Sequence, residues 1–530
     1  MKCRMLAIFL TSGAIAMGEL PIIPRPLEQR EAEGTLTLKE GGYVYAAAEV
    51  VVDWSRQLSA AAGLDLRPAP ADAAVAIQFL SADMLPADIA RPAGEGYVLR
   101  ILPTTILVHA ATPGGHFHGL QSLVQILEAA PRQQDGVVLE AMTVRDEPRF
   151  EWRGFMLDES RHFTGEDGVI RLLDQMARYK MNRFHWHLTD SPGWRIEIKR
   201  YPELAKVGGR GSETDRSPDA PAQYYTQEQI RRIVAYAKRK GITIIPEIDM
   251  PGHADAAVRA YPQHDGGGIG ANGKPFKWSH FTFNPAKPET LEFLDGILEE
   301  VASLFPDAGV IHFGGDEVHF GWGKWKELPE VKELMAREGF QELREVETWF
   351  NRRMAGRIDD LGFITGGWDE VAARGLPTDQ TLVFWWRHDR TDVLRQAIDD
   401  GYPVILCPRR PMYFDFVQDE SHKVGRRWEG FNPLADVYQF PDSLTLLKEE
   451  DWKMVRGIQA CLWTEETRTQ DRRDFMTFPR LLAAAEAGWT SRDRKDFDDF
   501  QKRLTREMPK LQKAGFMAFD ASASMSEIRE

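Results

Sequence analysis

Residues 310–317 read VIHFGGDE, an apolar run followed by two glycines and two adjacent acids. A short apolar run bounded by glycine is typical of a buried strand. In α/β folds with parallel strands, the chemistry gathers just beyond the carboxyl ends of the strands. The stretch therefore predicts a buried parallel strand that delivers Asp316 and Glu317 to a functional site.

The same order of apolar run and polar end recurs from about residue 148 onward. The candidate strands are 154–157, 183–188, 243–247, 310–313, 362–365, 382–386, 404–406 and 457–462. Amphipathic stretches at 168–179, 227–240 and 288–304 predict helices between some of them. Eight strands with intervening helices predict an α/β fold, a (β/α)8 TIM-type barrel over residues 148–500, followed by a C-terminal helix and tail over 501–530.

Residues 20–145 predict a smaller α+β accessory domain. Its short β-branched runs, separated by Gly, Pro and Asp, lie at 44–45, 50–52, 75–77, 97–99 and 106–108. The stretch 119–129 (GLQSLVQILEA) predicts a helix with one leucine-rich stripe. Paired acids and clustered histidines do not stand out in this part of the sequence, so we expect a structural role for it.

Residues 1–16 predict an export signal. Lys2 and Arg4 are basic, residues 5–16 are largely apolar, and Ala14-Ile15-Ala16 has the small-x-small pattern of a cleavage site. Of the 3 cysteines, Cys407 and Cys461 would remain after cleavage, which gives no disulfide framework. Elsewhere the sequence has no apolar run near the roughly 20 residues that a membrane span needs. We expect a periplasmic or secreted protein.

Composition limits the class of partner. The 530 residues include 66 basic and 80 acidic ones, a formal net charge of −14, and 43% are hydrophobic. That balance is typical of a globular protein, and acidity argues against nucleic acid, which needs a concentrated positive field. The chain also holds 15 tryptophans, which could fill the core or line a site.

Polar or aromatic residues follow all eight predicted strands. In strand order they are Asp158, Arg161 and His162; Thr189 and Asp190; Glu247, Asp249 and His253; Asp316 and Glu317; Trp368, Asp369 and Glu370; Trp385, Trp386 and Arg387; Tyr413 and Asp415; and Trp463 and Glu465. Indole faces stack on the apolar face of a sugar ring, and carboxylates accept hydrogen bonds from its hydroxyls. The rim therefore predicts a carbohydrate site.

The adjacent acids Asp316 and Glu317 suggest how a glycosidic bond would be cleaved. Two close carboxylates repel each other, so one pKa is expected to rise, which suits a general acid. Neighbours in an extended chain point in different directions, so the pair is poorly placed to flank one anomeric carbon as acid and nucleophile. A substrate that supplies its own nucleophile, the oxygen of a 2-acetamido group, fits the pair better.

At these residues the chain resembles glycoside hydrolase family 20, the β-N-acetylhexosaminidases. The resembling stretches are RGFMLDESRHF (153–163), NRFHWHLTDSPGWRIEIKRYPEL (182–204), IIPEIDMPGH (244–253), HFGGDE (312–317), GWDE (367–370) and GIQACLWTE (457–465). The stretch GHFHGLQSLVQIL (115–127) is similar to the end of the family's accessory domain. The resemblance implies an exo-acting retaining enzyme that removes terminal β-linked GlcNAc or GalNAc by substrate-assisted catalysis, without metal or cofactor.

The resemblance also implies residue roles. Glu317 is the expected general acid/base, Asp316 orients the acetamido N–H, and Tyr413 donates to the acetamido oxygen. Asp190 and His253 support Glu317, with Asp249 and Glu247 behind them. The expected pocket walls are Trp368, Trp386 and Trp463, and the expected partners of the sugar hydroxyls are Arg161, Asp415 and Glu465. One departure is Ser191-Pro192-Gly193, where the family commonly has Asp-Gln-Gly after the aspartate.

Two other classes of function stay open on the residues alone. A metal-dependent barrel amidohydrolase would use His185 and His187, with Glu247, Asp249 and His253 completing the site, although that superfamily carries its paired histidines on the first barrel strand. A sugar-binding module without catalysis would use the aromatic rim alone. The sequence leaves the sugar epimer, the natural glycan and the oligomeric state open, and also whether Trp385 or Trp428 reaches the sugar.

Overall fold

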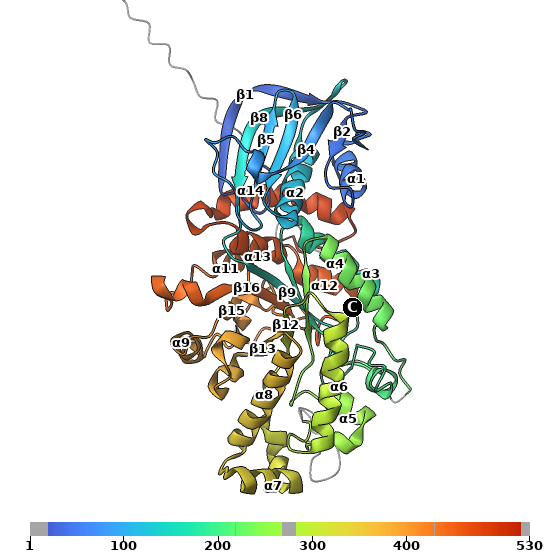
Figure 1. Cartoon of the computed structure of the whole chain (residues 1–530), viewed down its shortest axis with the longest axis vertical. Coiled ribbons are helices and arrows are strands. Elements are labelled where there is room, and N and C mark those ends of the chain that lie inside the picture. Colours follow the sequence, from blue (N-terminus) through green and yellow to red (C-terminus); the bar gives the residue numbers. More distant parts are fainter. Residues whose placement is uncertain (1–19, 218, 268–281, 429, 521–530) are drawn as a thin grey trace, which may run out of the picture.

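The computed structural model describes residues 20–217, 219–267, 282–428 and 430–520. A sheet with two helices sits on one end of a closed barrel, and the C-terminal helix α14 lies between the two (Figure 1). The predicted export signal, residues 1–16, lies outside the described residues. Among those that are described, none of the helices combines the length and apolar character that crossing a membrane requires.

The N-terminal sheet mixes parallel and antiparallel strands in the order β1-β8-β5-β6-β4-β2-β3, with β7 beside β8. The strands are β1 (Glu28–Leu38), β2 (Tyr43–Tyr45), β3 (Arg67–Pro68), β4 (Val75–Ser81), β5 (Tyr97–Leu102), β6 (Thr105–Ala110), β7 (Arg132–Gln133) and β8 (Gly136–Asp146). Helices α1 (Val51–Ala62) and α2 (Pro113–Ala129) accompany it. Leu120, Leu123 and Leu127 of α2 are fully buried, so the leucine-rich stripe covers the sheet as expected.

The strand predicted at residues 50–52 is wrong. These valines begin helix α1, whose Trp54, Leu58 and Ala61 are buried. Those three residues are spaced at i, i+4 and i+7, so they lie on one face of a helix. The burial of that face outweighs the strand preference of the three valines.

The catalytic part is a closed barrel of eight parallel strands, which confirms the predicted TIM-type fold. Its strands are β9 (Trp152–Asp158), β10 (Arg183–His187), β11 (Thr243–Glu247), β12 (Val310–His312), β13 (Ile364–Trp368), β14 (Thr381–Trp385), β15 (Val404–Leu406) and β16 (Val455–Leu462). The helices that follow are α3 (Glu166–Arg178), α4 (Gln227–Arg239), α5 (Asp255–Ala260), α6 (Pro288–Leu304), α7 (Pro329–Glu338), α8 (Leu343–Asp360), α9 (Thr391–Asp399), α10 (Arg409–Met412), α11 (Leu434–Gln439), α12 (Gln470–Thr477), α13 (Arg480–Trp489) and α14 (Phe497–Lys513).

The fifth strand begins later than the predicted 362–365. Gly362 has a φ of +86°, a left-handed turn conformation, so extended backbone starts only at Ile364 and runs to Trp368. Trp368 is therefore the last residue of the strand, at the carboxyl edge. The sixth strand ends at Trp385, and the side chains of Trp385 and Trp386 point in different directions at the carboxyl edge.

The apolar interior of the barrel is continuous with the aromatic residues of its carboxyl edge. One buried cluster joins the interior side chains Met156, Ile245 and Phe384 to Trp368, Tyr413 and Trp463. The edge residues are consequently packed on a filled barrel, which fixes the positions of their rings.

Candidate active site

A chain of charged side chains crosses the carboxyl edge of the barrel. Arg161, just after β9, places Nη1 2.7 Å from Oδ2 of Asp190, which follows β10. Oδ1 of Asp190 lies 3.0 Å from Nδ1 of His253, which follows β11. Nε2 of His253 lies 3.4 Å from Oδ2 of Asp316 and 3.8 Å from Oε2 of Glu317. Four predicted strand ends thus meet in one network.

Burial and charge together set the protonation of this network. Burial alone would raise the pKa of Asp190, but Arg161 and His253 outweigh it and hold the pKa well below its usual value. Burial would lower the pKa of His253, yet Asp190, Asp316 and Asp249 raise it well above 6.5. His253 is therefore an imidazolium near neutral pH, with its Nε2–H directed at the two acids.

Asp249 lies behind the acid pair and has the opposite character. Burial and the nearby charge of Asp316 raise its pKa well above the ordinary value, which favours its neutral form. Gly314 passes over it closely: a Cβ on Gly314 would lie 2.0 Å from Oδ1 of Asp249, and the φ of Gly314 is +72°. Glycine is required here by the approach to Asp249 as well as by the backbone conformation.

The adjacent acids differ in exposure. The Asp316 side chain is 13% exposed, whereas the Glu317 side chain is 41% exposed. Glu317 has a φ of +46°, which is uncommon for a residue with a side chain and costs energy that the surrounding structure has to offset. The turn thus leaves Asp316 more buried than Glu317, although both carboxylates lie within 4 Å of Nε2 of His253.

Three indoles and a phenol form the aromatic side of the site. The rings of Trp368 and Trp463 lie 5.8 Å apart, and the rings of Tyr413 and Trp463 lie 6.0 Å apart. Trp386 is nearly parallel to Tyr413, with ring centroids 6.5 Å apart and an interplanar angle of 10°. The guanidinium of Arg161 lies 5.0 Å from the Trp463 ring, which links the aromatic side to the charged chain.

Trp385 does not belong to this group. It is 1% exposed, donates from its indole N–H to the backbone oxygen of Arg390 at 3.3 Å, and packs in the main hydrophobic core. Because successive strand residues face opposite sides, only Trp386 turns toward Tyr413. Trp385 is therefore a core packing residue, and Trp386 is the tryptophan that lies at the site.

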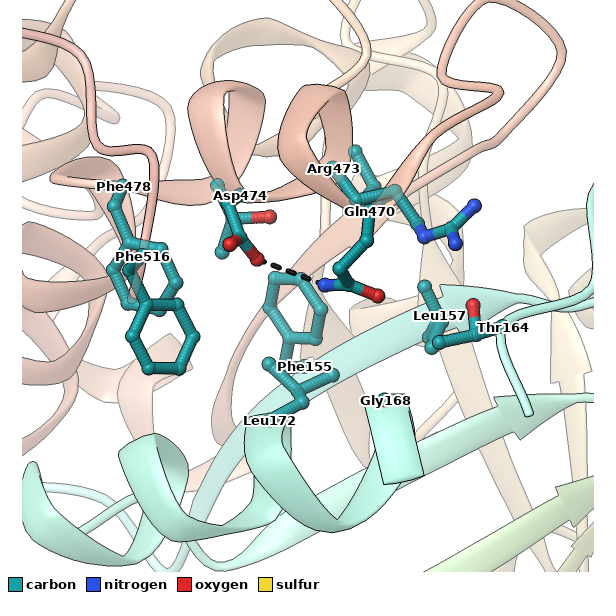
Figure 2. A pocket seen from close by; sticks show the side chains of 12 residues that line it. Phe155, Leu157, Thr164, Gly168, Leu172, Gln470, Arg473, Asp474, Phe478 and Phe516 are labelled. Carbon is teal, nitrogen blue, oxygen red and sulfur yellow. Dashed lines mark hydrogen bonds between the residues drawn. The ribbon is translucent and has the colours of Figure 1, made fainter. Parts of the chain in front are cut away.

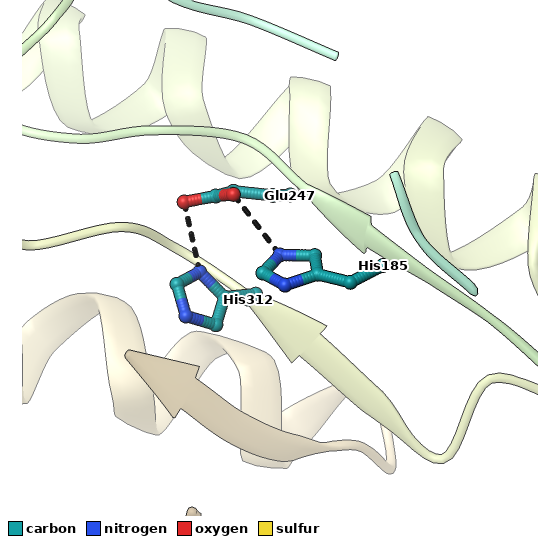
Figure 3. Close-up of side chains that lie close together, drawn as sticks. All are labelled: His185, Glu247 and His312. Atoms are coloured by element: carbon teal, nitrogen blue, oxygen red, sulfur yellow. Dashed lines mark ion pairs between the residues drawn. The ribbon is translucent and has the colours of Figure 1, made fainter. Parts of the chain in front are cut away.

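A histidine cluster surrounds Glu247, with His185 on β10, Glu247 on β11 and His312 on β12 (Figure 3). The carboxylate of Glu247 lies 3.0 Å from Nε2 of His185 and 3.0 Å from Nδ1 of His312, and it also contacts Nδ1 of His187. Its Oε1 accepts the indole N–H of Trp368 at 2.9 Å. Burial opposes ionisation of Glu247, but the surrounding imidazoles hold its pKa well below 4.5.

Those partners explain the cluster without a metal-binding role. The other nitrogen of His185 accepts from Gln459 at 3.0 Å, and the other nitrogen of His187 lies 3.0 Å from Asp190. His187 is thus held by hydrogen bonds on both sides, and His185 by a hydrogen bond on one side and the Glu247 carboxylate on the other; both rings are fully buried, as expected for histidines that pack inside the barrel. A metal would have to displace N–H donors that already neutralise the Glu247 carboxylate.

Asp415 and Glu465 are both bound by Arg426, which the sequence alone did not identify as a site residue. Nε of Arg426 lies 3.0 Å from Oδ2 of Asp415, and its Nη2 donates to Oε1 of Glu465. Burial raises the pKa of Asp415 to about 7, despite the opposing charge of Arg426. Arg426 lies in the stretch 418–432, which resembles no family motif, so only its folded position identifies it.

Trp428 lies in the same loop and is 46% exposed. Arg409 is placed between two indoles, with its guanidinium carbon 5.2 Å from the Trp386 ring and 5.2 Å from the Trp428 ring. Trp428 is therefore a neighbour of the site's outer edge. It does not contact the inner group of aromatic rings among the described residues.

The loop that departs from the family pattern still carries Asp190. The backbone N–H of Asp190 donates to the carbonyl of Gly193 at 3.2 Å, and that carbonyl also accepts from the Ser160 hydroxyl at 2.7 Å. Arg195 holds the same region from below, donating to the carbonyls of Glu159 and Ser160. Hydrogen bonds to backbone carbonyls thus fix the loop and do not involve the side chains of Ser191 and Pro192, where the sequence departs from the family pattern.

Two hollows elsewhere do not belong to the site. A cavity of about 20 Å³ between β9, α3 and α12 is lined by Phe155, Leu172 and Gln470, with Gln470 donating to Asp474 at 2.8 Å (Figure 2). Its volume suits roughly one water molecule. A cleft of about 530 Å³ between the N-terminal domain and α14 is lined by the ion pairs of Arg178 and Lys510 with Glu128.

A closed barrel whose carboxyl edge joins acids, an imidazolium and indole rings is characteristic of carbohydrate-cleaving barrel enzymes. The chain belongs to glycosyl hydrolase family 20. Residues 150–492 match the family's catalytic domain, and residues 19–147 match its domain 2. The resemblance seen in the sequence is confirmed, the chain is a glycoside hydrolase, and the amidohydrolase alternative is wrong.

Individual relatives agree in sequence and structure. The chain is 34% identical to a beta-hexosaminidase of Vibrio furnissii, over 88% of this chain and 76% of the relative. It is 32% identical to a beta-hexosaminidase of Porphyromonas gingivalis, over 97% of this chain and 67% of the relative. The crystal structure of an exo beta-N-acetylglucosaminidase from Vibrio harveyi in complex with N-acetylglucosamine superposes with a TM-score of 0.83 at 30% identity, over 95% of this chain and 79% of that one.

Proposed function

We propose that the chain is an exo-acting, retaining β-N-acetylhexosaminidase that removes terminal β-linked GlcNAc or GalNAc. The observation that carries this proposal is that the contacting rings of Trp368, Trp463 and Tyr413 lie beside the Asp316–Glu317 turn, with the Trp368 backbone N–H donating to the carbonyl of Gly314 at 2.9 Å. Family membership and the names of the relatives support the same activity. The substrate partner is a glycan with a non-reducing N-acetylhexosamine.

The terminal sugar would be held on the side of the buried ions. Arg161, Asp415 and Glu465 are the proposed partners of its hydroxyls. Arg161 and Arg426 already neutralise the two acids, so their oxygens are fixed as acceptors before substrate arrives. Preformed acceptors lower the entropy cost of binding a polar ligand.

The acetamido group would enter the aromatic pocket. Trp368, Trp386 and Trp463 enclose its methyl group, and the Tyr413 hydroxyl donates to its oxygen. Asp316 accepts its N–H and stabilises the positive charge that develops on the amide. The amide oxygen then attacks the anomeric carbon as the bond to the leaving oxygen breaks, which gives a cyclic oxazolinium ion.

Glu317 would move the protons. It gives its proton to the leaving oxygen, and as a carboxylate it takes a proton from the water that opens the oxazolinium ring. The configuration at the anomeric carbon is retained after two inversions. The exposed position of Glu317 at the rim suits a group that meets both the leaving group and water, and His253, held by Asp190, is the proposed group that tunes it.

Aryl glycosides test the proposal. The enzyme should release the chromophore from aryl β-N-acetylglucosaminide, from the galactosaminide, or from both, and should leave aryl β-glucoside almost untouched because it lacks the amide. Glu317→Gln should keep sugar binding and lose turnover, which also separates an enzyme from a binding module. Equal cleavage of the plain glucoside would contradict the mechanism.

We also propose export to the periplasm or the medium, supported by the basic and apolar residues of 1–16. N-terminal sequencing of the native protein should find a chain that begins after Ala16. A native protein that begins at Met1 and stays in the cytoplasm would contradict this.

A further inference from the structure

Trp386 is held at two points by the adjacent acids Asp369 and Glu370. Oδ2 of Asp369 accepts the backbone N–H groups of Trp386 and Arg387, each at 3.2 Å. Oε2 of Glu370 accepts the indole N–H of Trp386 at 3.0 Å. One acid thus fixes the backbone that carries the indole, and the other fixes the ring itself.

The hydrogen bond matters because packing holds Trp386 less firmly than the other pocket indoles. Trp368 is 1% exposed and Trp463 is 9% exposed, whereas Trp386 is only partly buried at the rim. A ring with a free edge keeps other rotamers accessible unless a directional bond selects one. Glu370 supplies that bond from the residue pair directly after Trp368, so one short segment places two walls of the pocket.

Glu370 itself is fixed and shielded. Its side chain is 15% exposed, and Nη1 of Arg387 lies 3.4 Å from its Oε1. Burial, Asp369 and Asp316 raise its pKa well above the ordinary value, and Arg387 opposes them. Protonated or ionised, one of its oxygens remains an acceptor for the indole N–H, so the bond does not depend on the charge.

We infer that Glu370 is a positioning residue: it locks the Trp386 indole parallel to Tyr413 as the outer wall of the acetamido pocket. The inference rests on the proposed function. Loss of the bond leaves the sugar hydroxyl contacts in place but lets the wall move away from the reacting amide. The cost therefore falls more on kcat than on KM, because the wall matters most when the amide oxygen attacks.

A double-mutant cycle on aryl β-N-acetylglucosaminide tests this. Glu370→Leu should lower kcat/KM about tenfold, the effect of one lost oriented hydrogen bond. Glu370→Gln keeps an acceptor oxygen and should stay within about threefold of the wild type. In a Trp386→Phe background the ring has no N–H, so adding Glu370→Leu should change kcat/KM by less than about threefold.

Glu486→Leu is the matched control for folding. Glu486 is also a buried glutamate paired with an arginine, Arg503 at 2.6 Å, but it lies on α13, whose Gly488 accepts from Phe150 just before β9, at the amino end of that strand. It should lower the melting temperature as Glu370→Leu does and leave kcat unchanged.

Three results would overturn the inference: equal losses for the Gln and Leu variants, the same loss from Glu370→Leu with or without Trp386, or a loss in KM alone. A wild type inactive on the N-acetyl substrate would contradict the proposed function and this inference with it. If the wild type is active and the effects of Glu370→Leu and Trp386→Phe are additive, the proposed function stands and only the inference about Glu370 is contradicted.

Discussion

Nδ1 of His253 lies 3.0 Å from Oδ1 of Asp190, and this pair connects Arg161 to Asp316 and Glu317. Asp190 also pairs with Arg161 at 2.7 Å, and the far nitrogen of His253 faces Asp316 at 3.4 Å. The same carboxylate therefore orients a guanidinium on one side and an imidazolium on the other. Its charge keeps both in place.

Asp190→Asn removes that charge and keeps the size. The pKa of His253, now raised well above 6.5, should fall, so the imidazolium loses its proton at lower pH than in the wild type. We expect kcat/KM to fall about 100-fold at neutral pH and its alkaline limb to move to lower pH. A pH profile of kcat/KM checks this, and an unmoved alkaline limb would contradict the assigned role of the pair.

Arg426→Met should weaken substrate binding. It leaves Asp415 and Glu465 facing each other without the cation that joins them, so their acceptor oxygens lose their fixed positions. We expect KM for the aryl substrate to rise about tenfold with a smaller change in kcat. Arg232→Met, which removes an exposed pair with Glu166, is the control and should change neither constant.

The barrel and most of the site could be predicted because both follow local rules. Apolar strands such as Thr243–Glu247 and Val404–Leu406 were located at their observed bounds, and so was helix Pro288–Leu304. Polar residues after a strand reach the carboxyl edge in any such barrel, which is why Asp190, His253 and Trp463 come together. The choice between Trp385 and Trp386 did not follow, because the sixth strand was expected to end at Trp386 and ends at Trp385.

Other features depend on contacts between distant segments, which a single sequence does not show. Arg426 reaches Asp415 and Glu465 from a long loop with no regular pattern. Glu370 is visible in the GWDE motif, but its bond to Trp386 needs the neighbouring strand to be in place. The valines at 50–52 favour a strand locally, and it is the burial of Trp54 and Leu58 on one helix stripe that makes these residues the start of α1.

Gly314→Ala should destabilise the fold because of what lies next to it. An added Cβ would meet Oδ1 of Asp249, and we expect a loss of about 3 kcal/mol or more in the free energy of unfolding. Gly309→Ala is a matched control, since Gly309 has a similar φ of +69° and its Cβ would meet no atom within 4 Å. It should cost about 1 to 2 kcal/mol. Equal losses in chemical denaturation would show that the contact with Asp249 contributes nothing.

Asp415 should make stability depend on pH in a defined direction. Its pKa is raised to about 7 in the folded state, above its ordinary 3.8. Its contribution to stability is therefore complete below pH 3.8 and is lost as the pH rises through about 7. The free energy of unfolding of the wild type, relative to Asp415→Asn, should fall by about 2 to 3 kcal/mol between pH 5 and pH 8. Denaturant titrations at the two pH values check this, and a constant or rising difference would contradict the raised pKa.

The central claim is that the substrate amide is the nucleophile, and progressive fluorination of the N-acetyl methyl group tests it most directly. Each fluorine withdraws electrons from the amide oxygen and leaves the sugar hydroxyls and the aryl leaving group unchanged. The account predicts that kcat/KM falls steeply along the series from acetyl to trifluoroacetyl, by about tenfold or more per fluorine. A flat series would mean that a protein carboxylate attacks the anomeric carbon, and would contradict the mechanism.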